Sequence, residues 1–161
     1  MEEIKAGLSE ERITEILAHL GNFGTVRELK GLSNAEIETI YGLGLDYYRA
    51  GDYANAEKIF RFLTVFEHTS SKYWTAMGSV QQVGGRFEEA TKSYAMATFF
   101  DLHNPKPMYY AAECFLKLGD LDNARKALAS LEAYGSKETE TGRRFQAKGA
   151  ELKAKLEDEA K

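Results

Sequence analysis

The sequence predicts an all-α protein, a superhelix of three stacked helix pairs with a capping helix at each end. One motif recurs with a fixed period, as AGDYANAEKIF, GGRFEEATKSY and LGDLDNARKAL, which begin at Ala50, Gly84 and Leu118, each 34 residues after the one before. A period of this length is typical of stacked supersecondary units. Within each copy the apolar residues lie three and four apart, which indicates helices rather than strands.

Small residues mark the places where each pair must turn and where its helices must meet. A glycine between the helices favours the left-handed backbone that closes a tight turn. Small residues inside the helices allow the partner helix to approach closely, and Gly42 is assigned to packing on the same ground. The three aligned sets are Gly51, Gly85 and Gly119; Gly44, Gly78 and Ala112; and Ala56, Ala90 and Ala124.

The units resemble the tetratricopeptide repeat, whose pattern is W-x₂-L-G-x₂-Y followed by A-x₃-F over 34 residues. The second unit matches it with Trp74 and Gly78 at the expected spacing. The three repeats are predicted at residues 37–70, 71–104 and 105–138, each a helix, a turn and a helix.

The ends of such a stack need segments that cover its open faces. Residues 1–36 are predicted to hold a helix that Gly21 ends, followed by a connecting segment, and residues 139–161 a polar capping helix. A capping box from Ser33 to Glu36 is expected to open the first repeat. The N-terminal apolar stripe is a surface for a partner or for packing on the first repeat, and both alternatives stay open. It consists of Ile13, Ile16, Leu17 and Leu20.

The composition excludes several classes of function. A net charge of −4 and a pI near 5.5 give no basic patch for nucleic acid, and no apolar run is long enough to insert into a membrane. No nucleotide, metal or catalytic motif is present, so we expect no enzyme and no cofactor. Cys114 is expected to be a buried, inert thiol. The polar N-terminus and the single cysteine favour a cytosolic protein.

A second stripe of side chains runs beside the core stripe in each leading helix. Leading helices line the concave face of a solenoid, so this stripe is predicted to form a groove for an extended peptide. Its apolar members would alternatively contact the N-terminal segment, and His68 is placed either in the groove or at a helix end. The stripe consists of Glu38, Tyr41, Leu45 and Tyr48; Lys72, Thr75, Ser79 and Gln82; and Lys106, Tyr109, Glu113 and Leu116.

The chain also resembles the class II chaperones of bacterial type III secretion. The residues that carry this likeness include Phe23-Gly24-Thr25, the Pro-x-Pro at 105–107 and the Ala-Ala-Glu-Cys at 111–114. The resemblance implies a bacterial cytoplasmic chaperone that holds the extended N-terminal segment of hydrophobic translocators, keeps them export-competent and dimerises through its N-terminal helix. A general tetratricopeptide adaptor for another extended peptide is the alternative.

The resemblance also places the family's groove residues on this sequence. Leu45 stands where relatives often carry an aromatic residue, so the shape of one pocket is expected to differ. The implied groove residues are Tyr41, Leu45, Tyr48, Tyr53 and His68, continued by Lys72, Thr75, Ser79, Tyr109 and Glu113.

Overall fold

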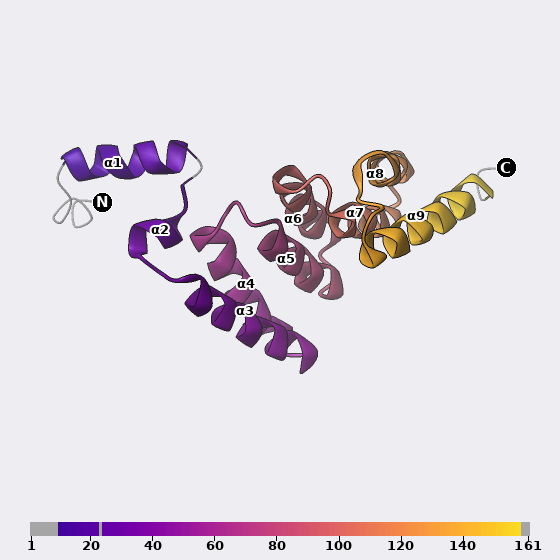
Figure 1. Cartoon of the computed structure of the whole chain (residues 1–161). Coiled ribbons are helices and arrows are strands. Elements are labelled where there is room, and N and C mark those ends of the chain that lie inside the picture. The colour runs from indigo at the N-terminus through magenta and orange to yellow at the C-terminus, as the bar shows by residue number, and fades with distance from the viewer. Residues whose placement is uncertain (1–9, 23, 159–161) are drawn as a thin grey trace.

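The computed structural model describes residues 10–22 and 24–158, and this part of the chain is helices joined by short turns (Figure 1). The predicted all-α tetratricopeptide superhelix is confirmed. Three helix pairs follow one another, with α9 after the last. The helices are α1 (Glu10–Gly21), α2 (Val26–Lys30), α3 (Asn34–Arg49), α4 (Tyr53–Phe66), α5 (Ser71–Val83), α6 (Phe87–Phe100), α7 (Pro105–Lys117), α8 (Leu121–Tyr134) and α9 (Glu140–Asp158).

The turn inside each pair follows from its glycine. Gly51, Gly85 and Gly119 have φ angles of 79°, 74° and 74°, in the left-handed region as predicted. Asp52 and Asp120 then cap α4 and α8 by accepting a hydrogen bond from a backbone N–H in the first turn. These local features bring the two helices of each pair back to back.

The close approach of paired helices depends on two glycines. A Cβ at Gly44 would lie 2.6 Å from Cε1 of Phe60, and one at Gly78 would lie 2.6 Å from Cε1 of Tyr94. Both rings are essentially fully buried, so the predicted packing role is confirmed. The same role for Gly42 is wrong, because a Cβ there would meet nothing within 4 Å.

Polar contacts tie the first repeat to the second. Arg86, at the turn before α6, donates two hydrogen bonds to the Glu57 carboxylate of α4, at 2.6 and 3.1 Å. These bonds hold the pKa of Glu57 below its usual value. The indole of Trp74 donates to the backbone oxygen of His68 at 2.6 Å, which fixes the link between α4 and α5.

The two ends of the stack differ. At the C-terminus, Phe145 of α9 is buried against α7 and α8. At the N-terminus, α1 extends away from the repeats (Figure 1), and α2 meets the end of α4 through an ion pair between Arg27 and Glu67. The predicted capping box between Ser33 and Glu36 is present.

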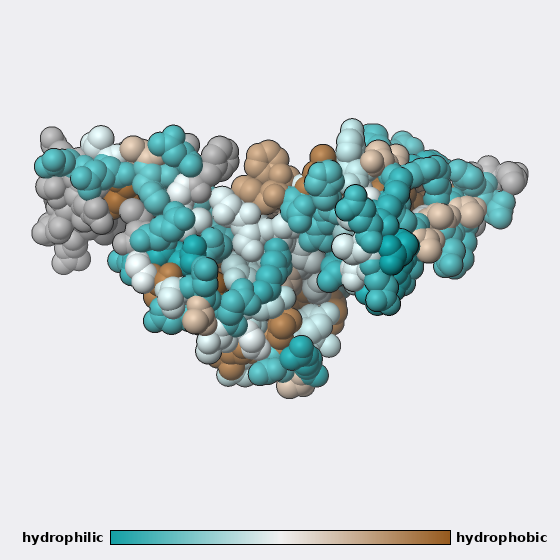
Figure 2. Space-filling view, viewed as in Figure 1, coloured by the Kyte–Doolittle hydropathy of each residue, from teal (hydrophilic) through white to brown (hydrophobic). Residues whose placement is uncertain are grey.

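The visible face of the molecule is mostly hydrophilic, with small hydrophobic groups near its middle (Figure 2). Among the helices described, none is long and apolar enough to cross a membrane.

Candidate functional site

The leading helices α3, α5 and α7 enclose an open cleft of about 350 Å³. It contains several residues of the predicted groove stripe and is the candidate functional site. Its lining consists of Tyr41, Leu45, Tyr48, Phe60, Lys72, Thr75, Ala76, Ser79, Asn104, Lys106 and Tyr110.

The wall on α3 is aromatic. The ring of Tyr41 lies 6.0 Å from that of Phe60 and 5.4 Å from that of Tyr73, and Tyr48 meets Tyr53 edge-on at 5.5 Å. Burial raises the pKa of Tyr41 and of Tyr48, so both phenols stay neutral near pH 7. Such a wall presents apolar ring faces together with hydroxyl groups.

The cleft exists because the second repeat has small residues between larger neighbours. Thr75 aligns with Tyr41 in the repeat before and with Tyr109 in the repeat after. The hydroxyls of Thr75 and Ser79 donate to backbone oxygens of their own helix, at 2.7 and 2.9 Å. The Ser79 oxygen also accepts a long hydrogen bond from the Tyr94 hydroxyl, at 3.4 Å. A hydroxyl oxygen has two lone pairs, so each of the two residues keeps at least one to accept a hydrogen bond from a ligand.

The rim near the helix N-termini carries charge. Lys72 donates to both oxygens of Glu38, at 2.6 and 2.8 Å, and its ammonium lies 4.0 Å above the ring of Tyr41. The hydrogen bond from Lys72 is the main cause of a lowered pKa at Glu38. Lys106 stands at the equivalent position of the third repeat.

In the third repeat, Tyr110 rather than Tyr109 faces the cleft. Tyr109 is only 9% exposed and packs against Phe145 of α9, with ring centroids 5.4 Å apart. Burial is the main cause that raises its pKa to about 12. Tyr110 stacks on Tyr94 at 5.7 Å and lines the cleft. The predicted set lacked four residues that line the cleft, Phe60, Ala76, Asn104 and Tyr110. The only sign of them in the sequence was that Tyr110 directly follows Tyr109.

Three other predicted residues gather in a neighbouring hollow. Gln82, Glu113 and Leu116 lie together with Phe87 and Lys117 near the other ends of α5 and α7. The Gln82 amide donates to Glu113 at 3.3 Å and its oxygen accepts from the Tyr94 hydroxyl at 2.7 Å. This hollow is separate from the lining of the main cleft.

The structure does not bring His68 or Tyr53 into the cleft lining. Of the two predicted places for His68, the structure agrees with the helix end: it follows the last residues of α4, and its ring lies 6.4 Å from that of Phe100 at the end of α6. Tyr53, the first residue of α4, is 39% exposed and supports Tyr48 from the side.

The predicted dimerisation stripe is described only in part. The side chains of Ile13, Leu17 and Leu20 lie outside the described residues, and Ile16 is partly buried. Among the residues that are described, no cluster suits a metal ion. Cys114 is fully buried, and burial raises the pKa of its thiol to about 12, so it is no nucleophile at neutral pH.

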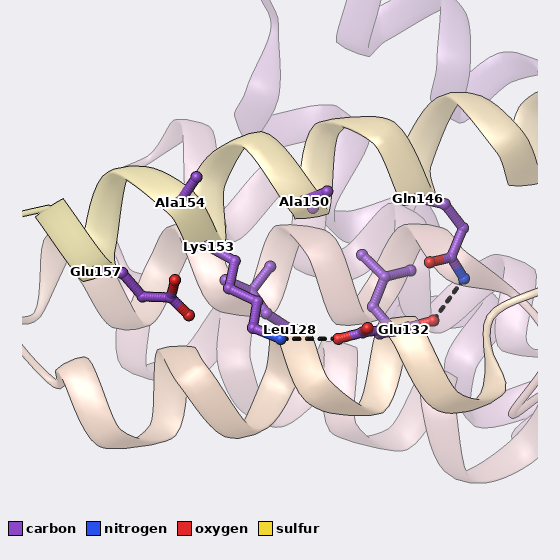
Figure 3. Close-up of a pocket in the computed structure, with 9 residues that line it drawn as sticks. Leu128, Glu132, Gln146, Ala150, Lys153, Ala154 and Glu157 are labelled. Carbon is purple, nitrogen blue, oxygen red and sulfur yellow. Dashed lines mark hydrogen bonds and ion pairs between the residues drawn. The ribbon is translucent and has the colours of Figure 1, made fainter.

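A larger hollow of about 450 Å³ lies in the seam between α8 and α9 (Figure 3). Lys153 of α9 pairs with Glu132 of α8 at 2.9 Å, and the Gln146 amide donates to the backbone oxygen of Leu131 at 2.6 Å. A Cβ at Gly149 would lie 2.6 Å from Leu131. These contacts hold the capping helix in place, so we interpret the seam as structural.

The fold and the cleft define a class, a three-repeat tetratricopeptide superhelix with a partly aromatic concave cleft. Tetratricopeptide family models match residues 37–69 and 108–134. The chain belongs to the translocator chaperones of type III secretion, as the following similarities show.

Low calcium response locus protein H of Yersinia pestis is 32% identical over 105 residues, an alignment that covers 65% of this chain and 62% of that protein. The structure is similar to that of PcrH of Pseudomonas aeruginosa in complex with the chaperone binding region of PopD. That match has a TM-score of 0.76 and 30% identity, and covers 81% of this chain and 98% of PcrH. The structure is also similar to that of the translocator chaperone SycD of Yersinia enterocolitica, with a TM-score of 0.71 and 29% identity. This match covers 84% of this chain and 98% of SycD.

Proposed function

We propose that this protein is a chaperone that binds an extended segment of a hydrophobic translocator in the cleft between α3, α5 and α7. The observation that carries the proposal is the aromatic cleft itself, in a chain whose relative PcrH is crystallised with the chaperone binding region of PopD. Covering that segment keeps the translocator soluble and ready for export in the bacterial cytoplasm, without catalysis.

The chemistry of the cleft suits a peptide in extended conformation. Tyr41 and Leu45 offer apolar surface for one large side chain, and the buried ring of Phe60 lies behind them. Thr75 and Ser79 offer oxygen acceptors for peptide N–H groups, which an extended chain leaves unpaired. The cleft thus combines a pocket for one side chain with hydrogen-bond acceptors for the peptide backbone. This combination suits an extended segment and favours some peptide sequences over others.

Filling the cleft tests this proposal without removing any core contact. Thr75→Tyr places the side chain found at this position in the first and third repeats into the cleft. The variant is co-expressed with a tagged translocator of the same secretion system, and the amount of translocator that co-purifies with it is measured. This amount should be about tenfold or more below that of the wild type. Its melting temperature should stay close to that of the wild type.

Thr39→Tyr is the matched control. Thr39 is exposed on α3, and its hydroxyl makes the same kind of backbone bond, to Ala35 at 2.8 Å. This variant should retain the translocator normally. If both variants retain the translocator equally well, the binding site lies elsewhere. If the wild type binds an unrelated extended peptide but no translocator, the general tetratricopeptide adaptor is favoured.

A homodimer through α1 is a second part of the proposal. It is supported by the amphipathic pattern of the N-terminal stripe and by the way α1 extends from the repeats (Figure 1). An apolar stripe on a helix that leaves the stack needs a partner surface to be shielded from water.

A further inference from the structure

The rim of the cleft carries one positive charge that its surroundings do not balance. Glu38, Lys72 and Lys106 occupy the same position in three successive repeats, 34 residues apart. The first two form an ion pair at 2.6 Å. Among the described residues, no carboxylate lies within ion-pair distance of the Lys106 ammonium.

The lining of the cleft is otherwise neutral. Its only charged members in the described chain are Lys72 and Lys106. Lys106 is exposed in the first turn of α7, where its backbone N–H donates to the Asn104 side chain at 3.2 Å. The positive end of the helix dipole adds to the charge of the ammonium there. In a protein with a net charge of −4, Lys106 is therefore a positive charge at the rim of an otherwise neutral cleft lining.

We infer that the bound segment carries an aspartate or glutamate beside its apolar anchor residue, and that Lys106 pairs with this carboxylate. The inference rests on the proposed function and adds a charge requirement to it. The apolar anchor enters between Tyr41 and Tyr110, whereas the carboxylate stays at the rim where the leading helices begin. Lys72 contributes less because Glu38 already balances it.

Short fluorescein-labelled peptides provide the probe. Each has one central leucine in a serine and glycine background, flanked by aspartate, asparagine or lysine. In fluorescence polarisation at low salt, the wild type should bind the aspartate peptide about three- to fivefold more tightly than the asparagine peptide, as for an exposed ion pair. High salt should reduce this preference.

The variants decide whether Lys106 is responsible. Lys106→Gln should abolish the preference, and Lys106→Glu should reverse it in favour of the lysine peptide. Lys92→Gln, an exposed position on α6 outside the cleft, should leave it unchanged. A preference that survives both Lys106 variants, or that disappears in Lys72→Gln instead, overturns the inference.

Peptide binding and translocator retention are separate measurements, so the two proposals fail separately. If the wild type retains a translocator but shows no charge preference among the peptides, the inference about Lys106 is wrong and the chaperone function stands. If Thr75→Tyr retains the translocator as well as the wild type does, the cleft is not its binding site.

Discussion

Two glycines that lie two residues apart in α3 have opposite surroundings. Gly44 faces the Phe60 ring, whereas Gly42 faces open space. Glycine in a helix interior is less favourable than alanine unless its small size is needed. The residue type alone therefore does not reveal the role of a helical glycine.

Substitution by alanine should have opposite effects on stability at Gly44 and at Gly42. Gly44→Ala should lower the free energy of unfolding by about 1–3 kcal/mol, because the new methyl overlaps a buried ring. Gly42→Ala should raise it by about 0.5–1 kcal/mol, because the helix gains propensity without a clash. Urea unfolding followed by circular dichroism measures both, and a loss at Gly42 would show that its face is occupied.

At the scale of elements, α9 acts as the partner that the third repeat would otherwise lack. Phe145 is 2% exposed and meets Tyr109 and Tyr110 edge-on, at 5.4 and 5.6 Å. Phe145 contacts both tyrosines, but only Tyr110 also stacks on Tyr94 of α6 and lines the cleft, whereas Tyr109 is 9% exposed.

Removal of this anchor should destabilise the C-terminal end. Phe145→Ala should reduce the free energy of unfolding by about 3–5 kcal/mol, as expected for a buried phenylalanine. Phe99→Ala, at a ring that is 70% exposed on α6, is the control and should cost less than about 0.5 kcal/mol. Chemical denaturation compares the two, and similar costs would mean that α9 does not cap the stack in solution.

The N-terminal helix leads to a prediction about assembly. Ile16→Glu places a charge in the apolar stripe and should shift the mass measured by light scattering from dimer towards monomer. Ala18→Glu, at an exposed position of the same helix, should leave the mass unchanged. If the Ile16 variant keeps the wild-type mass, α1 is not the interface.

At the scale of the whole molecule, buried groups that titrate at high pH couple stability to alkaline conditions. Burial raises the pKa of Cys114 from 9.0 to about 12, and that of Tyr109 from 10.0 to about 12. When the pKa of a group is higher in the folded than in the unfolded state, its contribution to stability is fully present below the unfolded-state pKa. This contribution is lost as the pH rises through the folded-state pKa.

Stability should therefore decrease as the pH rises from about 9 towards 12. Urea midpoints measured at several pH values across this range should fall, and the fall should be less steep in Cys114→Ala, which lacks the thiol. Below pH 9 the two proteins should show parallel pH dependence. A wild-type midpoint that stays constant up to pH 11 would contradict the burial of these groups.

Most of the scaffold was predictable because its causes are local. The positive φ of Gly51, Gly85 and Gly119 depends on a few neighbouring residues, and so does the capping box from Ser33 to Glu36. The candidate site was predicted less completely. Tyr41, Leu45, Tyr48, Lys72, Thr75 and Ser79 line the cleft, but their role in binding remains a prediction.

The sequence by itself determined the repeats, the helices and the turns, because each depends on contacts within one 34-residue unit. Only the tertiary structure decided that Tyr110 faces the cleft, that Tyr109 is covered, and that His68 lies against Phe100. The physical reason is that a side chain on a helix can face any of several directions. Segments far along the chain, here α6 and α9, select one direction by burying apolar surface against it.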